Sequence, residues 1–113
     1  MKLITKFSCA FKGLFAGFKQ PSILFQVFWA AVAITVFAFL QIDYYEWLTV
    51  IVMIALVWLS EWVNSLIEKT VDYISLKTDK RAEEIKDLGA GLVLLAGFFA
   101  LVVGLLILAK YLL

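Results

Sequence analysis

The sequence contains no histidine and only one cysteine, Cys9. Zinc sites are usually built from cysteine and histidine, and a disulfide needs two cysteines, so the chain by itself forms neither. A glycine-rich phosphate-binding loop is also missing. Hard cations such as Mg²⁺ remain compatible with the composition, because carboxylate and amide oxygens bind them.

Charged residues are also scarce: they make up 17% of the 113 residues, whereas 65% are hydrophobic. Soluble domains contain about 45–50% apolar residues, and a mean hydropathy of +1.01 lies far outside their range. The length corresponds to one domain. We therefore expect a single integral membrane domain over residues 1–113, with no nucleic-acid partner.

The first 20 residues mix lysines with large apolar side chains, and the apolar ones recur at spacings of three or four. This pattern predicts a basic amphipathic helix over residues 1–20 that lies in the headgroup region of a membrane. A long apolar core with a small-residue cleavage site is missing, so we expect no signal peptide. Pro21 ends this helix and suits the first turn of the next one.

Three apolar stretches reach the length of about 20 residues that a bilayer requires. They predict transmembrane helices at residues 22–41, 47–75 and 87–110, the second with an extension into water, and a charged connector at residues 76–86. In the third stretch, small residues mark places where helices can approach closely: Gly89, Gly91, Gly97 and Gly104. The predicted fold is all-α, with a surface helix and three transmembrane helices.

Lysine and arginine are distributed unevenly around these stretches. They precede the first stretch and border the charged connector, whereas the short acidic turn between the first two stretches has none. Cytoplasmic loops carry the excess of positive charge in multi-pass proteins. We therefore expect a multi-pass protein of the cell inner membrane with the N-terminus and the second connector in the cytoplasm.

A polar stripe follows the uncharged run Trp47–Leu59. On a helix, Glu61, Asn64, Glu68 and Asp72 fall within about 80° of one another and span roughly 16 Å. A carboxylate at the centre of a bilayer costs about 2.5–3.5 kcal/mol, so it tends to face a bundle interior and to have a function. In the alternative interpretation, the helix has left the membrane by Glu61 and the stripe is a solvated face.

A single chain with three spans has few faces that could bury two or three carboxylates. We therefore expect a symmetric homo-oligomer, a trimer, to enclose the stripe from Glu61 to Glu68 between helices. The stripe faces Lys86 and Asp87 at the foot of the next helix. A base, cation ligands and a cationic phosphate clamp in one place indicate phosphoryl transfer.

Two motifs identify a family that the chain resembles. The first is Glu61-x-x-Asn64-Ser65-x-Ile67-Glu68-x-x-Val71-Asp72, and the second is Lys86-Asp87-x-Gly89-Ala90-Gly91. Together with Lys12-Gly13-Leu14 in the surface helix, they closely resemble the signature of the small bacterial diacylglycerol kinase and undecaprenol kinase family. The resemblance covers nearly the whole chain and implies a trimeric lipid kinase that uses ATP and Mg²⁺.

The resemblance also implies roles for individual residues. Glu61 is similar to the base that takes the proton from the lipid hydroxyl, and Glu68 to a Mg²⁺ ligand that also contacts the nucleotide. Asn64 would orient the phosphates or the metal, Lys86 would contact the γ-phosphate, and Asp87 would contact the nucleotide. Asp72 also matches the signature, although an ion pair with Lys69 would explain it equally well.

The chain departs from the family where members usually carry an acidic second metal ligand before the first span. Pro21 occupies that position when the chain is counted on from Lys12-Gly13-Leu14. Asp72, Asp79 or a carboxylate of another subunit would then complete the site, or catalysis is weakened.

Undecaprenol is the expected substrate, since the compact chain and Ala90 resemble Gram-positive-type members. Diacylglycerol is the first alternative. The second alternative is a non-catalytic membrane protein, either a holin or a relative that has lost its second metal ligand.

Overall fold

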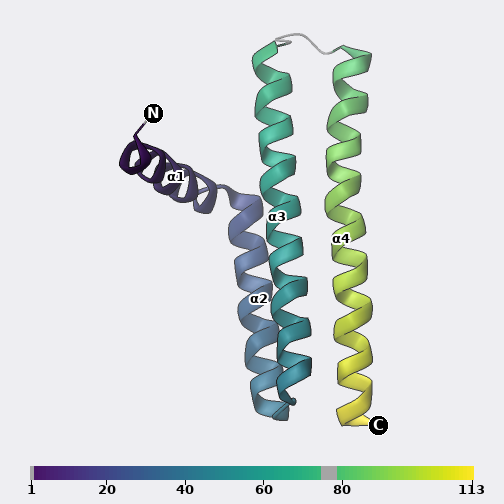
Figure 1. The fold of residues 1–113 in the computed structure, drawn as a ribbon. Helices are drawn as coiled ribbons and strands as arrows, with labels where there is room; N and C mark the ends of the chain where they lie inside the picture. The colour runs from purple at the N-terminus through teal and green to yellow at the C-terminus, as the bar shows by residue number, and fades with distance from the viewer. Residues whose placement is uncertain (1, 75–78) are drawn as a thin grey trace.

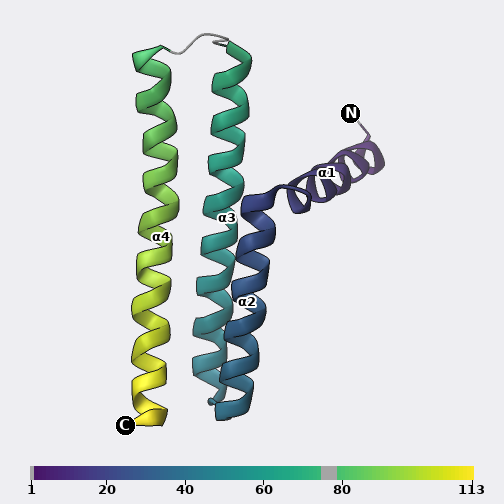
Figure 2. The same cartoon turned by 180° about the vertical axis from the view of Figure 1, so that it is seen from behind.

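The computed structural model describes residues 2–74 and 79–113, which form four α-helices and no strands (Figure 1). In chain order they are α1 (Leu3–Phe18), α2 (Pro21–Leu40), α3 (Tyr44–Ile74) and α4 (Lys80–Leu112). α2, α3 and α4 run side by side, and α1 projects from the bundle at the start of α2 (Figures 1 and 2). α2, α3 and α4 are each long and apolar enough to cross a membrane, so the all-α fold with three candidate spans is confirmed.

The first two spans begin slightly earlier than predicted. α2 starts at Pro21, one residue before the expected range, because proline fits the first helical position, where no backbone N–H is needed. α2 ends at Leu40, and the left-handed backbone of Gln41, with φ of 55°, reverses the chain. α3 then begins at Tyr44 rather than at residue 47, while the predicted end at residue 75 lies outside the described residues.

Residues 80–86 of the predicted connector are helical, because α4 already begins at Lys80. Asp79 caps this helix, since its Oδ1 accepts a hydrogen bond of 3.1 Å from the backbone N–H of Arg81. Glu83 in the first turn interacts favourably with the helix dipole. The charged residues 80–86 are therefore part of α4 and do not interrupt it. The remaining connector residues 76–78 are outside the described part of the chain.

The bundle helices differ in length, and this difference decides where the polar residues lie. α2 contains 20 residues and spans about 30 Å, whereas α3 and α4, with 31 and 33 residues, span about 46 and 50 Å. α3 and α4 both extend past the start of α2 (Figure 1). Asp72 and Lys86 lie on this extension, and they form an ion pair between the two helices.

Small residues allow two close approaches to α3. At Gly17 of α1, an added Cβ would lie 1.8 Å from the Trp62 ring, and the adjacent Phe18 packs edge-on against Trp62 at 5.3 Å. At Gly89 of α4, it would lie 2.5 Å from Asn64 Oδ1. These contacts attach the end of α1 and the N-terminal part of α4 to α3.

The prediction that neighbouring helices approach α4 closely at its glycines is confirmed only in part. Gly89 meets α3, and at Gly104 an added Cβ would touch the Phe37 ring of α2 at 4.0 Å. Nothing in the described residues lies within 4 Å of the corresponding position at Gly91 or Gly97. Gly91 is exposed, whereas Gly97 is partly buried and lines a hollow beside α2 without touching it closely.

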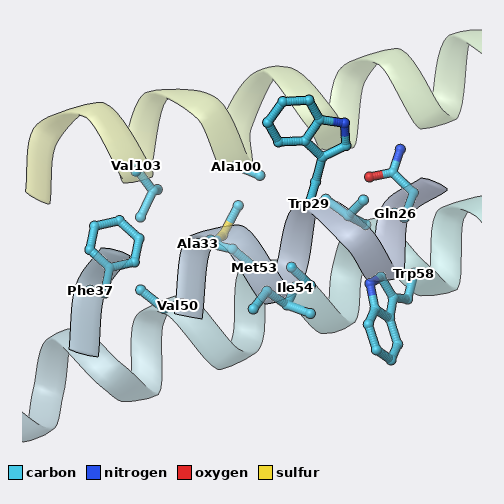
Figure 3. A pocket seen from close by; sticks show the side chains of 13 residues that line it. Gln26, Trp29, Ala33, Phe37, Val50, Met53, Ile54, Trp58, Ala100 and Val103 are labelled. Atoms are coloured by element: carbon cyan, nitrogen blue, oxygen red, sulfur yellow. The ribbon is translucent and has the colours of Figure 1, made fainter. Parts of the chain in front are cut away.

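An apolar cavity of about 160 Å³ lies between α2, α3 and α4 (Figure 3). Gln26 and Trp58 line one end of it, and Phe37, Val50 and Val103 line the other. Gln26 is the polar exception in a lining that otherwise consists of apolar and aromatic side chains. The cavity is therefore polar at the end formed by Gln26 and apolar elsewhere.

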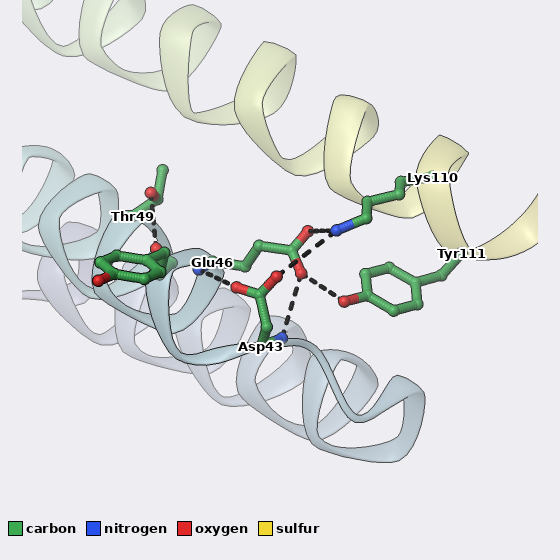
Figure 4. A network of polar contacts seen from close by, with 6 residues as sticks. Asp43, Glu46, Thr49, Lys110 and Tyr111 are labelled. Atoms are coloured by element: carbon green, nitrogen blue, oxygen red, sulfur yellow. Dashed lines mark hydrogen bonds and ion pairs between the residues drawn. The ribbon is translucent and has the colours of Figure 1, made fainter.

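At the opposite end of the bundle, four side chains join the start of α3 to the end of α4 (Figure 4). We call Asp43, Glu46, Lys110 and Tyr111 the far-end cluster. The Asp43 N–H donates to Glu46 Oε1 at 3.1 Å, and the Glu46 N–H donates to Asp43 Oδ1 at 2.9 Å, which together cap α3. Lys110 Nζ lies 3.4 Å from Glu46 Oε2 and 3.5 Å from Asp43 Oδ2, and the Tyr111 hydroxyl donates to Glu46.

Asp43 lies in the turn outside the spans. The Glu46 N–H, together with Lys110, holds the pKa of the Asp43 carboxyl below its ordinary value. The sequence interpretation assigned Lys110 only to the end of the third span and missed the cluster.

Glu46→Gln is expected to weaken the far-end cluster, because it removes the charge that Lys110 and Tyr111 both contact. The Glu46 side chain is only 15% exposed, so the loss should lower the free energy of unfolding by about 1–3 kcal/mol. Thermal unfolding in detergent would measure this change. Tyr73→Phe is the control, because Tyr73 is 89% exposed and should tolerate the change. An unchanged midpoint for Glu46→Gln would show that the cluster does not stabilise the bundle.

Candidate functional site

Glu61 is buried between α2 and α3, with 6% of its surface exposed. Its Oε1 accepts a hydrogen bond of 3.1 Å from Nε2 of Gln26 on α2. The neighbouring Ser60 is equally buried, but its hydroxyl donates to the Val57 carbonyl of its own helix at 2.7 Å. The interpretation of the stripe as a solvated face is therefore wrong at Glu61, because α2 covers this side of α3.

The burial of Glu61 also corrects one step of the sequence interpretation. We expected a second subunit to be needed to enclose the carboxylates. Within one chain, Gln26 already lies against Glu61, so the burial of this carboxylate requires no partner. Glu68, in contrast, is exposed in the single chain.

Asn64 lies one turn above Glu61 and contacts the next carboxylate. Its Nδ2 donates to Glu68 Oε1 at 3.2 Å, while its Oδ1 is buried against Gly89 and has no hydrogen-bond partner among the described residues. The opposite orientation of the amide would place two acceptors together, so the hydrogen bond to Glu68 determines which way it points. Asn64 thus holds Glu68 on the side of α3 that faces α4.

Lys86 of α4 forms an ion pair with Asp72 of α3. The interpretation that Asp72 pairs with Lys69 of its own helix is not what the structure shows, because α4 brings Lys86 into contact with Asp72. The two side chains are 38% and 63% exposed, so the pair contributes little to stability and is open to exchange. Lys86 is one turn from Gly89 and lies on the same side of α4.

These contacts arrange the polar residues in order along α3, from Glu61 beside α2 to Asp72 beside α4. We call this row the polar seam; it consists of Glu61, Asn64, Glu68, Asp72 and Lys86. Glu61 lies deepest in the bundle, and Asp72 and Lys86 lie on the extension beyond α2. The seam thus joins an apolar interior to the polar end of the molecule.

Two of the predicted site residues are outside the polar seam. Asp87 is exposed and lines a shallow hollow formed by α4 residues alone, on a different side of the helix from Lys86. Asp79 caps α4 through Arg81, which gives its carboxylate a structural partner. Within one chain, neither carboxylate is shown to contact Glu68.

The donor set is compatible with Mg²⁺ bound together with phosphates. In residues 2–74 and 79–113, no group of three cysteine, aspartate or glutamate side chains gathers closely enough to hold a metal alone. Mg²⁺ at nucleotide sites uses only one or two protein carboxylates and takes further oxygens from phosphates and water. Glu68 is an exposed carboxylate, which suits this mode.

Sequence reasoning missed the contact of Gln26 with Glu61. Its one available signal was that Gln26 is the strongly polar residue within the first apolar stretch. The contact joins positions 35 residues apart, and no local spacing rule connects them.

A family model described as prokaryotic diacylglycerol kinase matches residues 8–108. The matched segment begins inside α1, includes the polar seam and ends shortly before the last turn of α4. No curated protein matches the chain.

Proposed function

The chain belongs to the prokaryotic diacylglycerol kinase family, a family of membrane lipid kinases, and has three candidate spans. We therefore propose that it transfers the γ-phosphoryl group of ATP to a membrane lipid alcohol. The observation that carries this proposal is the polar seam. A buried carboxylate, Glu61, lies where the alcohol of a lipid would arrive. The groups suited to phosphates and a cation, Asn64, Glu68 and Lys86, continue from it toward water.

In the proposed reaction, Glu61 accepts the proton of the lipid hydroxyl while the hydroxyl oxygen bonds to the γ-phosphorus. The bond from that phosphorus to the bridging oxygen breaks, and ADP leaves with the electron pair. Lys86 contacts the γ-phosphate, for which it must exchange its exposed partner Asp72. Asp87 contacts the nucleotide.

Glu68 would hold Mg²⁺, and Asn64 would keep that carboxylate in place through the hydrogen bond to its Oε1. When bound, the cation neutralises charge on the transferred phosphoryl group. Asp72 and Asp79 remain candidates for an additional ligand, although the structure gives each of them another partner.

We propose undecaprenol as the substrate, supported by the resemblance of Ala90 and the compact chain to Gram-positive-type members. Purified protein in detergent should phosphorylate undecaprenol faster than diacylglycerol when both are offered with labelled ATP and Mg²⁺. Faster labelling of diacylglycerol would assign the alternative substrate. Metal-dependent ATP binding without product would indicate a relative that has lost catalysis, and neither binding nor product would favour a non-enzymatic protein such as a holin.

We also propose that the chain works as a homotrimer in the cell inner membrane, with α1 on the cytoplasmic surface. Large apolar side chains are exposed along α2, α3 and α4, and Asp87 faces away from the seam of its own chain. A neighbouring subunit at that face would allow Asp87 to serve a second site. Native mass measurement should show a trimer, and a fully active monomer would contradict the proposal.

Pro21→Glu is expected to lower the Mg²⁺ concentration needed for half-maximal activity. Pro21 precedes Gln26 by about 7.5 Å along α2, and Glu68 follows Glu61 by about 10 Å along the antiparallel α3, so a carboxylate at position 21 would lie near the level of Glu68. An acidic side chain at a helix start is also favourable by ~0.3–1 kcal/mol.

Ser22→Glu is the matched control for Pro21→Glu. It adds the same charge about 100° further around α2, so it should change the Mg²⁺ dependence much less. Titration of activity with Mg²⁺ measures both variants. If Pro21→Glu leaves the midpoint unchanged, another carboxylate completes the site, and Asp72 and Asp79 should be tested next.

A further inference from the structure

We propose that Gln26 is a positioning residue for Glu61, a role that rests on the proposed lipid kinase function and deepens it. The amide of Gln26 donates to Oε1 of Glu61 at 3.1 Å. That bond occupies one carboxylate oxygen and leaves Oε2 to accept the proton of the lipid alcohol. Gln26 itself exchanges no proton.

The environment of Glu61 explains why such a donor is needed. A buried carboxylate is costly unless it is hydrogen-bonded, and Glu61 is 6% exposed. Among the described residues, Gln26 provides the side-chain hydrogen bond to this carboxylate. The nearby Ser60 hydroxyl does not replace it, because that hydroxyl donates to its own helix. Loss of the amide would thus leave Glu61 buried without this partner.

A neutral amide also suits the proposed chemistry better than a cationic side chain would. Lysine or arginine in this place would bring a positive charge that opposes the uptake of a proton by the carboxylate. Glutamine orients the carboxylate without adding charge.

The place of Gln26 in the bundle links the base to the apolar interior. Its side chain lines the polar end of the cavity between α2, α3 and α4, opposite the end formed by Phe37 and Val103 (Figure 3). Because Gln26 comes from α2 and Glu61 from α3, the bond also fixes the relative level of the two helices. A shift of the base by about 1 Å can lower a catalytic rate by about 10²-fold.

Gln26→Met tests this role, because methionine has a similar length and cannot donate. We expect kcat for lipid phosphorylation to fall by about 10- to 100-fold, with the KM for ATP near the wild-type value. Gln26→Asn keeps the amide on a shorter side chain and should have an intermediate kcat, which also provides a second variant if Gln26→Met does not fold. Thr35→Val is the control on α2, since Thr35 is exposed and its hydroxyl donates to Ala31 of its own helix.

A double-mutant cycle separates positioning from a structural role. In a Glu61→Asp background the shorter carboxylate no longer reaches Gln26, so Gln26→Met should lower kcat by less than about twofold further. An equal loss in both backgrounds, or a wild-type kcat in Gln26→Met, would overturn the positioning role while the kinase proposal stands. Absence of lipid phosphorylation by the wild-type protein would overturn both proposals.

Discussion

Glu61→Gln is expected to lower kcat by about 10²- to 10⁴-fold, which is the contribution that a general base usually makes. Glutamine keeps the size of the side chain and the oxygen that accepts from Gln26, but it cannot take up the proton of the alcohol. The KM for ATP and the Mg²⁺ dependence should stay near the wild-type values, because Glu61 lies deeper in the bundle than the groups proposed to bind the nucleotide. Steady-state kinetics with the lipid substrate would measure both effects.

The control for Glu61→Gln is the same substitution at Glu46 in the far-end cluster. Glu46→Gln should lower stability and leave the kinetic constants unchanged, because Glu46 contacts only residues at the opposite end of the bundle. A Glu61→Gln protein with wild-type kcat would show that another group accepts the proton. If kcat falls equally in both variants, the loss in Glu61→Gln is explained by unfolding and not by the missing base.

Glu68→Gln is expected to act on binding, with a loss of at least about tenfold in apparent affinity for Mg²⁺ and ATP together. Even groups that only support metal ligands usually contribute 10–100-fold to metal affinity, so loss of a carboxylate ligand should cost at least as much. The substitution retains an oxygen that can accept the hydrogen bond from Asn64, so it removes charge with little change in geometry. Nucleotide binding measured by calorimetry across a range of Mg²⁺ concentrations would detect it.

Comparison of these two variants tests the division of roles along the polar seam. Glu61→Gln should bind Mg²⁺ and ATP normally and turn over slowly, whereas Glu68→Gln should bind weakly and recover part of its turnover at high Mg²⁺. Equal nucleotide binding by both variants would refute this division.

The helices were largely predictable, because each apolar stretch matches the thickness of a bilayer and Pro21 marks a boundary. The start of α4 was not, because the charged residues from Lys80 to Lys86 were interpreted as a connector. A high content of charged residues indicates that a segment is exposed to water, but an exposed segment can still form a helix. Here Asp79 caps the N-terminus of that helix.

The candidate site was predictable where it depends on spacing within one helix. Asn64 and Glu68 are four positions apart, and their hydrogen bond follows from helical geometry. The partners of Glu61 and Asp72 depend on how neighbouring helices are rotated and how far they are shifted along the bundle, which no local pattern determines. Gln26 therefore became visible as the partner of Glu61 only in the assembled bundle. Lys86 was expected opposite the stripe, but its pairing with Asp72 was not.

The unequal lengths of the helices have a kinetic consequence. Glu61 lies at the level of Gln26, inside α2, whereas Asp72 lies about 16 Å further along α3, beyond the start of α2, and pairs with Lys86. The proposed reactants therefore come from two different phases. The lipid alcohol is supplied by lateral diffusion, and its effective concentration is its mole fraction in the bilayer. The nucleotide is supplied by diffusion in three dimensions, and its concentration is that of the bulk solution. Dilution of the alcohol with inert lipid should therefore slow the enzyme, whereas dilution of the same vesicles with buffer at constant ATP should leave the rate per enzyme molecule unchanged.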